Sequence, residues 1–168
     1  MTVAIRAEAP GDARAIAGVV GEAFGGNDVE PKLVSLIRQR GEVLTSLVAV
    51  RNEIIIGHVL VSPIELDDAS DVEFAGIAPL SVAVDCQGQG IGGMLMRAAI
   101  AASRRQEIAA LFLLGNPQYY RRFGFVSSHI GNEYGATGSF MHFELLPGCL
   151  QDKSGVARYV SAFQDAGA

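Results

Sequence analysis

The chain has 168 residues, of which 49% are hydrophobic and 18% are charged, and its formal net charge is −5. This composition is that of a globular protein and excludes a disordered one. The length suits one hydrophobic core, so we expect residues 1–168 to form a single domain. The acidic balance argues against a general surface for nucleic acid or anionic membranes, because both require clustered positive charge.

The N-terminal part predicts one strand followed by two helices. Residues 3–6 are β-like. An apolar face at helical spacing comes next, with Asp12 as the candidate N-cap and glycines 25–26 as the stop. A second helix is expected to begin at Pro31, since proline suits a first helical position, and to end at Gly41.

Three strands are predicted after these helices. Two β-branched runs flank Asn52 and Glu53, which indicates a hairpin with a short turn. Residues 67–71 are a polar loop tip, and residues 74–84 predict a further strand. Pro79 interrupts this strand, and a proline in a sheet requires a bulge or an edge position.

The second half is predicted to alternate helices and strands. After a glycine-rich loop, an apolar stripe indicates a helix that ends near residues 104–105. The fully apolar segment 108–114 predicts a strand buried on both faces. A turn and a short helix are expected in residues 115–124, and a last strand over 140–146. The order β-α-α-β-β-β-α-β-α-β indicates an α/β protein of the mixed α+β type.

The glycine-rich loop fits two phosphate-binding patterns. Residues 88–93 match G-x-G-x-x-G, whereas Gln87 to Gly92 match Q-x-x-G-x-G. Backbone N–H groups that lead into a helix form an anion site, so both patterns predict a ligand with a diphosphate. The first pattern, typical of dinucleotide enzymes, also requires an acidic residue for the ribose about 20 residues later. The next strand is followed by Asn116 and has no carboxylate at its end, which disfavours a dinucleotide oxidoreductase.

Two segments make the sequence resemble the GCN5-related N-acetyltransferases (the GNAT superfamily) over nearly its whole length. They are "PLSVAVDCQGQGIGGML" and, one strand later, "LFLLGNPQYYRRFGF". The second segment is similar to one typical of the bacterial YhbS-like subgroup of acetyltransferases. The resemblance implies a GNAT-like fold with a twisted mixed sheet of about six to seven strands and about four helices.

The resemblance also implies acetyl-CoA as cosubstrate and direct transfer of its acetyl group to a primary amine. The backbone of one strand would line the pantetheine, the glycine loop would bind the diphosphate, and an asparagine would contact the pantetheine arm. The corresponding residues of this sequence are Leu80, Ser81 and Val82 for the strand, Gln87, Gly88, Gln89, Gly90, Ile91, Gly92 and Gly93 for the loop, and Asn116 for the arm. Asn116 followed by proline is also good turn chemistry in its own right.

Tyr120 aligns with the tyrosine that this family places near the thioester sulfur, so the resemblance implies that Tyr120 is the general acid. On a helix, Tyr119 and Tyr120 point about 100° apart, so only one of them faces the sulfur. The general base is not assigned. The candidates are Glu30, His58, Glu73 and a water chain. His58 lies in a β-like run and is favoured as a hydrogen-bonded sheet residue, and Glu30 also suits the N-terminus of a helix.

Arginines occur close to both motifs. The basic pair 121–122 and the helical residues Arg97, Arg104 and Arg105 are candidates for contacts to a CoA phosphate. A solvated surface or pairing with carboxylates is the favoured interpretation for all of them.

The favoured function is therefore an acetyl-CoA-dependent N-acetyltransferase of an unidentified small molecule, peptide or protein. The alternative is a catalytically silent acyl-CoA sensor or regulatory module on the same fold. The acidic composition favours a cationic acceptor: a polyamine, an aminoglycoside-like amine, a peptide N-terminus or a lysine. Exposed sheet edges are compatible with a homodimer.

Neither a membrane nor a metal is expected as a partner. No apolar run reaches the ~18 residues of a membrane span, and no signal peptide is evident, which predicts a cytoplasmic protein. Cys86 and Cys149 have neither metal-ligand nor disulfide spacing, so we expect two reduced thiols and no metal site.

Overall fold

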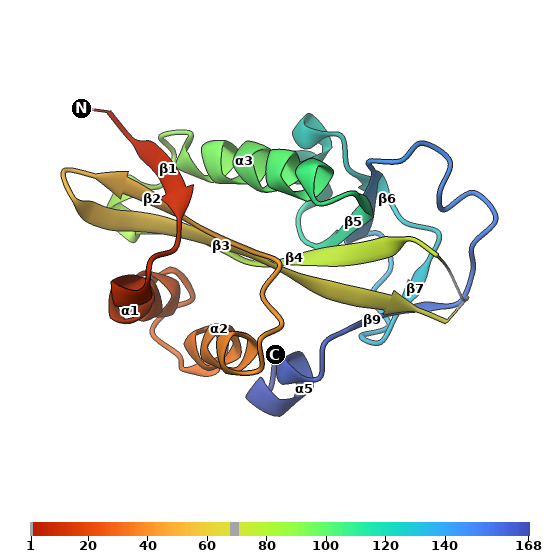
Figure 1. Cartoon of the computed structure of the whole chain (residues 1–168), viewed down its shortest axis with the longest axis horizontal. Coiled ribbons are helices and arrows are strands. Elements are labelled where there is room, and N and C mark those ends of the chain that lie inside the picture. The colour runs from red at the N-terminus through yellow and green to blue at the C-terminus, as the bar shows by residue number, and fades with distance from the viewer. Residues whose placement is uncertain (1, 68–70) are drawn as a thin grey trace.

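The computed structural model describes residues 2–67 and 71–168 (Figure 1). Its strands are β1 (Ala4–Ala7), β2 (Thr45–Arg51), β3 (Ile54–Leu66), β4 (Glu73–Val82), β5 (Ile108–Leu114), β6 (Val126–Ser127), β7 (Gly131–Asn132), β8 (Phe140–Glu144) and β9 (Val156–Tyr159). Its helices are α1 (Ala13–Ala23), α2 (Val29–Gln39), α3 (Ile91–Arg105), α4 (Pro117–Tyr120) and α5 (Ala162–Ala166). Short 3-10 turns are η1 (Pro10–Asp12), η2 (Val84–Cys86) and η3 (Arg121–Phe123).

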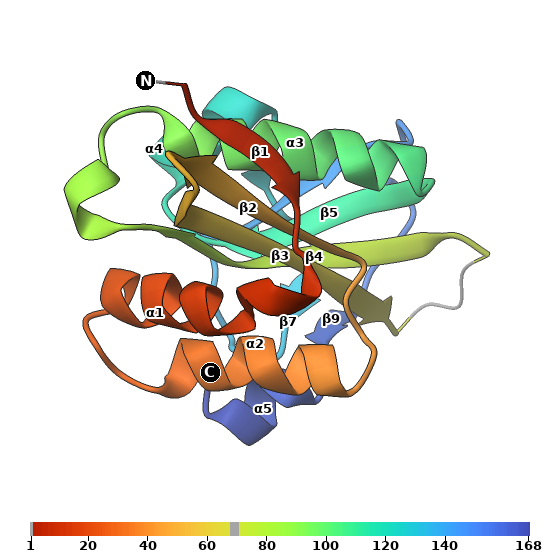
Figure 2. The same ribbon diagram turned by 60° about the vertical axis from the view of Figure 1, so that its left-hand side comes forward.

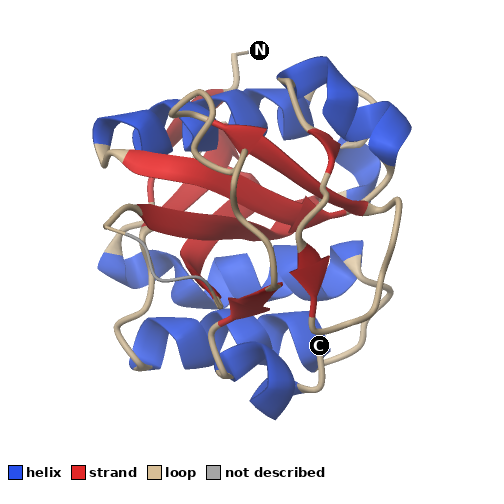
Figure 3. Ribbon diagram, turned by 90° about the vertical axis from the view of Figure 1, so that its right-hand side faces the viewer, coloured by secondary structure: helices blue, strands red, loops and turns tan. Residues whose placement is uncertain are grey.

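The strands form one mixed sheet in the order β1-β2-β3-β4-β5-β8-β6, and β9 pairs with the far end of β3 and with β7. Neighbours on the main path are antiparallel except β4 and β5, which are parallel and are connected through α3. Helix α3 covers one face of the sheet, and α1, α2 and α5 cover the other (Figures 1 and 2). Figure 3 shows the sheet between these two helical layers.

Alternation along the strands divides the core into two clusters. In β3, Leu60 and Ile64 pack in the cluster under α1 and α2, whereas Val59 and Val61 pack in the cluster under α3. Strand β5 is buried on both faces, as its apolar sequence predicts, because Ala110 and Phe112 pack in one cluster and Leu111 and Leu113 pack in the other. Both clusters therefore pack against the same sheet, one on each face.

The parallel strands β4 and β5 diverge, and this divergence positions the functional site. Their pairing ends at Gly76 and Phe112, although β4 continues to Val82. In the same part of β4, Leu60 of β3 is opposed by two residues, Ala78 and Pro79, joined by a cis peptide bond. The bulge predicted at Pro79 is thus confirmed, and it lies in a central strand.

Most predicted elements are confirmed, with shifts of one or two residues. The turn residues Asn52 and Glu53 both have positive φ, 52° and 63°, as a tight hairpin requires. Helix α2 begins at Val29, before the expected start at Pro31. Of the predicted loop tip 67–71, the middle three residues lie outside the described residues.

The described residues contain three strands and one helix that the sequence did not predict, namely β6, β7, β9 and α5. Each has only two to five residues, so too little alternation or helical periodicity accumulates for a sequence pattern to be recognised.

Candidate active site

The glycine loop is held between β4 and α3 by its glutamines. Gly88 and Gly90 have φ values of 76° and 83°, a region that glycine enters without strain. The Gln87 side chain donates a hydrogen bond to the Val82 carbonyl at 3.0 Å, and the Gln89 side chain accepts one from Arg51 at 3.0 Å. These bonds direct the loop into the N-terminus of α3, where the first N–H groups of a helix lack intrahelical partners.

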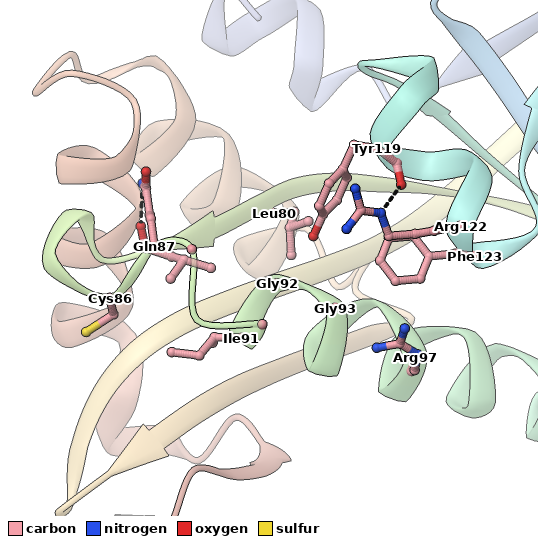
Figure 4. Close-up of a pocket in the computed structure, with 13 residues that line it drawn as sticks. Leu80, Cys86, Gln87, Ile91, Gly92, Gly93, Arg97, Tyr119, Arg122 and Phe123 are labelled. Carbon is pink, nitrogen blue, oxygen red and sulfur yellow. Dashed lines mark hydrogen bonds between the residues drawn. The ribbon is translucent and has the colours of Figure 1, made fainter.

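A groove with a volume of about 510 Å³ runs along this loop (Figure 4). One side is formed by Leu80 and Val82 of β4 and by the loop itself, and the other by side chains that follow β5. Arg97 and Arg122 both line it, so two positive charges flank the helix N-terminus. The groove therefore has the charge and the backbone donors that a diphosphate requires.

Two glycines in the first turn of α3 leave room for two side chains that line the groove, Tyr119 and Arg97. A Cβ atom on Gly92 would lie 2.7 Å from the Tyr119 hydroxyl, and a Cβ on Gly93 would lie 3.0 Å from Nη1 of Arg97. Figure 4 shows the Tyr119 hydroxyl directed toward Leu80 and Gly92. Larger residues at these positions would push the wall away and change the width of the groove.

The backbone of β4 directs N–H groups away from β3 where β5 has diverged. The N–H of Ala83 bonds to Ile56 of β3 at 2.8 Å. Because successive N–H groups of a strand alternate in direction, those of Val82 and Leu80 face away from β3. The Ser81 side chain is 1% exposed, so Ser81 contributes no side chain to the groove.

A second cavity, of about 550 Å³, contains Tyr120, Glu30 and Leu80. Leu80 lines both cavities, so the groove and this cavity adjoin at the bulged end of β4. The Tyr120 ring packs against Gly115, where a Cβ atom would collide with it. Burial raises the pKa of Tyr120 to about 12, with a smaller contribution from Tyr119, so this hydroxyl keeps its proton.

The two neighbouring tyrosines point into different cavities. Their rings are perpendicular, with centroids 4.9 Å apart, which agrees with the divergence predicted from their helical spacing. Tyr119 lines the groove and Tyr120 lines the second cavity. Tyr119 was not among the predicted site residues, although the spacing on the helix had predicted that only one of the two rings faces the sulfur.

The three candidate bases are far from equivalent. Glu30 lines the second cavity from the first turn of α2. His58 is fully buried, bonds to the Ser46 hydroxyl at 2.9 Å and is a sheet residue, as the sequence favoured. Burial lowers the pKa of His58 to about 4. Glu73 is exposed at the first residue of β4, the end opposite to the bulge.

Asn116 lies in a turn, as its sequence context predicted, whereas two of the arginines line the groove. The Asn116 side chain accepts a hydrogen bond from the Gln118 N–H at 3.0 Å and caps α4, so its turn chemistry is confirmed and its contact to pantetheine stays a prediction. Arg97 and Arg122 line the groove, where a solvated surface was favoured. They stack on Phe123 and Tyr119 respectively, which holds the guanidinium groups at the groove wall.

The site combines a glycine loop at a helix N-terminus with a bulged strand whose parallel neighbour diverges, and two cavities adjoin at that bulge. Together these features define the acyltransferase class of the GNAT fold. The chain belongs to the GNAT acetyltransferase family. The model of the acetyltransferase (GNAT) domain matches residues 42–127. An uncharacterized N-acetyltransferase of Escherichia coli K12, YhbS, is 36% identical over 122 residues, which is 72% of each chain.

Two solved structures extend the likeness to nearly the whole chain. The crystal structure of Escherichia coli YhbS in complex with CoA has a TM-score of 0.90 at 31% identity and covers 96% of this chain and 92% of its own. A GNAT family acetyltransferase from Brucella melitensis, in complex with acetyl-CoA, has a TM-score of 0.83 at 32% identity and covers 96% and 98%.

The structure describes residues 2–67 and 71–168. Within these ranges no helix has the length and apolar character to cross a bilayer. The same ranges bring together no three histidine, cysteine or acidic side chains in a metal-binding group. Both cysteines are free thiols, as expected.

Proposed function

We propose that the protein is an acetyl-CoA-dependent N-acetyltransferase that acts on a primary amine. The observation that carries this proposal is the meeting of two cavities at Leu80, one beside the glycine loop and one containing Tyr120. A transferase without a covalent intermediate must bring two substrates to one point from different sides, and this arrangement supplies such a point. The CoA and acetyl-CoA complexes of the two structural relatives support the choice of cosubstrate.

In this proposal the groove holds the cosubstrate. The diphosphate lies on the N–H groups of the glycine loop, between Arg97 and Arg122, and the pantetheine runs along β4 toward Leu80. The N–H groups of Leu80 and Val82 lie where they can polarise the thioester carbonyl. A donor of this kind is worth about 3–4 kcal/mol of transition-state stabilisation.

The proposed reaction transfers the acetyl group in one addition and elimination. The lone pair of the neutral amine forms a bond to the thioester carbonyl carbon, and the carbon–sulfur bond then breaks. The nitrogen loses one proton, the sulfur gains one, and the products are the acetamide and the free thiol of CoA. Tyr120, which burial keeps protonated beforehand, donates its hydroxyl proton to the leaving sulfur, and the proton that the nitrogen loses returns Tyr120 to its protonated form.

The experiment is thiol release from acetyl-CoA with a panel of primary amines. We expect release that depends on the amine and that falls at least tenfold in Tyr120→Phe but less than threefold in Tyr119→Phe. If acetyl-CoA binds and stabilises the protein but no amine releases thiol, the sensor alternative replaces this proposal. The cytoplasmic location expected from the sequence stays a prediction.

A further inference from the structure

The cavity that contains Tyr120 is walled mainly by aromatic and aliphatic side chains. Its aromatic residues are Phe24, Tyr120, Tyr134, Tyr159 and Phe163. Tyr159 is in ring contact with Tyr134 and with Phe163, at centroid distances of 6.0 and 4.5 Å, so these three rings form a continuous wall. Such a wall buries the apolar body of a small molecule.

Three large side chains at the opening of this cavity are partly exposed to solvent. Phe24, Leu114 and Tyr134 have exposed fractions of 37%, 38% and 40%, and all three line the cavity. They come from three separate parts of the chain, after α1, at the end of β5 and between β7 and β8. Large apolar side chains that gather from separate elements around one opening indicate a binding site.

Glu30 is the one charged side chain among the described residues that line this cavity. It lies in the first turn of α2, and its Oε2 atom is inaccessible to solvent without a hydrogen-bond partner in the described part of the chain. A buried carboxylate oxygen that lacks a partner is destabilising. A cationic ligand in the cavity would be attracted by the Glu30 carboxylate and by the surrounding aromatic faces.

We propose that the acceptor is a primary amine with one cationic head and a compact apolar body, such as an arylalkylamine, and that Glu30 binds its ammonium group. This inference rests on the proposed function, since it assigns the second cavity to the acceptor. The aromatic wall holds the apolar body, and Glu30 determines the preference for an amine over a neutral analogue. The ammonium releases one proton to water before the neutral nitrogen attacks the thioester at Leu80.

The neighbouring cavity argues for the main alternative, a polyamine. It adjoins through Tyr134 and Tyr159 and contains Glu42, Glu65 and Glu133. Arg158 also lines that cavity and pairs with Asp67 at 3.3 Å, and the Glu133 carboxylate already accepts the Tyr159 N–H at 3.1 Å. We therefore assign specificity to the cavity beside Leu80, where the reacting amine must lie.

The first test measures binding without turnover, by titrating the CoA-saturated protein with 2-phenylethylamine and with the neutral analogue 2-phenylethanol. We expect the amine to bind at least tenfold more tightly to the wild type and less than threefold more tightly to Glu30→Gln. The control Glu22→Gln changes an exposed carboxylate of α1 and should keep the wild-type preference. Equal binding of amine and alcohol, binding of neither, or a preference that survives Glu30→Gln would overturn the inference.

The second test compares kcat/KM for 2-phenylethylamine and spermidine in thiol release. We expect at least a tenfold preference for 2-phenylethylamine and a raised KM for this amine in Glu30→Gln. A preference for spermidine would overturn the inference in favour of a polyamine. Selective binding of 2-phenylethylamine without any thiol release would support the amine site and contradict only the transferase proposal.

Discussion

At the scale of single residues, His58 illustrates how a buried polar group is kept neutral. Its ring bonds to Ser46 and lies 4.0 Å from the Glu8 carboxylate, which in turn forms a bidentate ion pair with Arg38. Burial lowers the pKa of His58 from 6.5 to about 4, and the opposing effect of Glu8 is smaller. The unfolded chain therefore binds a proton at His58 before the folded protein does.

This shift predicts a loss of stability in acid. The folded pKa is the lower one, so the contribution of His58 is complete above pH 6.5 and is lost as the pH falls toward 4. The shift corresponds to about 3 kcal/mol over this window. Urea unfolding at pH 7.5, 6, 5 and 4 measures it, with His58→Gln as comparison. An equal slope in the variant would contradict this origin and would assign the loss to the other groups whose pKa is lowered in the folded protein, namely His142, Glu8 and Asp12.

At the scale of elements, the contact between α3 and α4 sets the width of the groove. Gly92→Ala places a Cβ atom 2.7 Å from the Tyr119 hydroxyl, so Tyr119 must move at the groove wall. We expect the dissociation constant for acetyl-CoA to rise at least tenfold, about 1.4 kcal/mol, while thermal stability is unchanged.

The matched control is Gly18→Ala in α1, where an added Cβ would have no described atom within 4 Å apart from its chain neighbours and its own helix backbone. Alanine in a helix interior is about 0.5–1 kcal/mol better than glycine, so this variant should gain stability and keep its affinity for acetyl-CoA. Similar affinities in Gly92→Ala and the wild type would refute the role assigned to Tyr119 at the groove wall. Isothermal titration calorimetry and thermal unfolding provide the two readouts.

The sequence predicts an element correctly where a single local pattern determines its conformation, and the same holds for part of the site. Asn52 and Glu53, Pro79 and Gly124 each have local conformations that the sequence requires, and the glycine loop lies where its motif indicates. Arg97 and Arg122 could not be placed, because their positions depend on stacking against rings from η3 and α4. The separation of Tyr119 from Tyr120 likewise depends on how α4 packs against Gly92 and Gly115.

At the scale of the whole molecule, we propose that residues 1–168 form one cooperative domain. The two hydrophobic clusters lie on opposite faces of the same strands, so neither can lose its packing without disturbing the other. We expect a single unfolding transition by circular dichroism and by tyrosine fluorescence, and acetyl-CoA at 100 times its dissociation constant should add about 2.7 kcal/mol to the stability. Two separated transitions would contradict one domain.

The central claim is that acetyl-CoA lies in the groove with its thioester at Leu80, between the two cavities. A crystal structure with acetyl-CoA tests it most directly. The account predicts the diphosphate on the N–H groups of Gly88 to Gly93, the carbonyl oxygen at the N–H groups of β4, and the Tyr120 hydroxyl within hydrogen-bond distance of the sulfur. A diphosphate away from the glycine loop, or an acetyl group directed away from the cavity that contains Glu30, would contradict it.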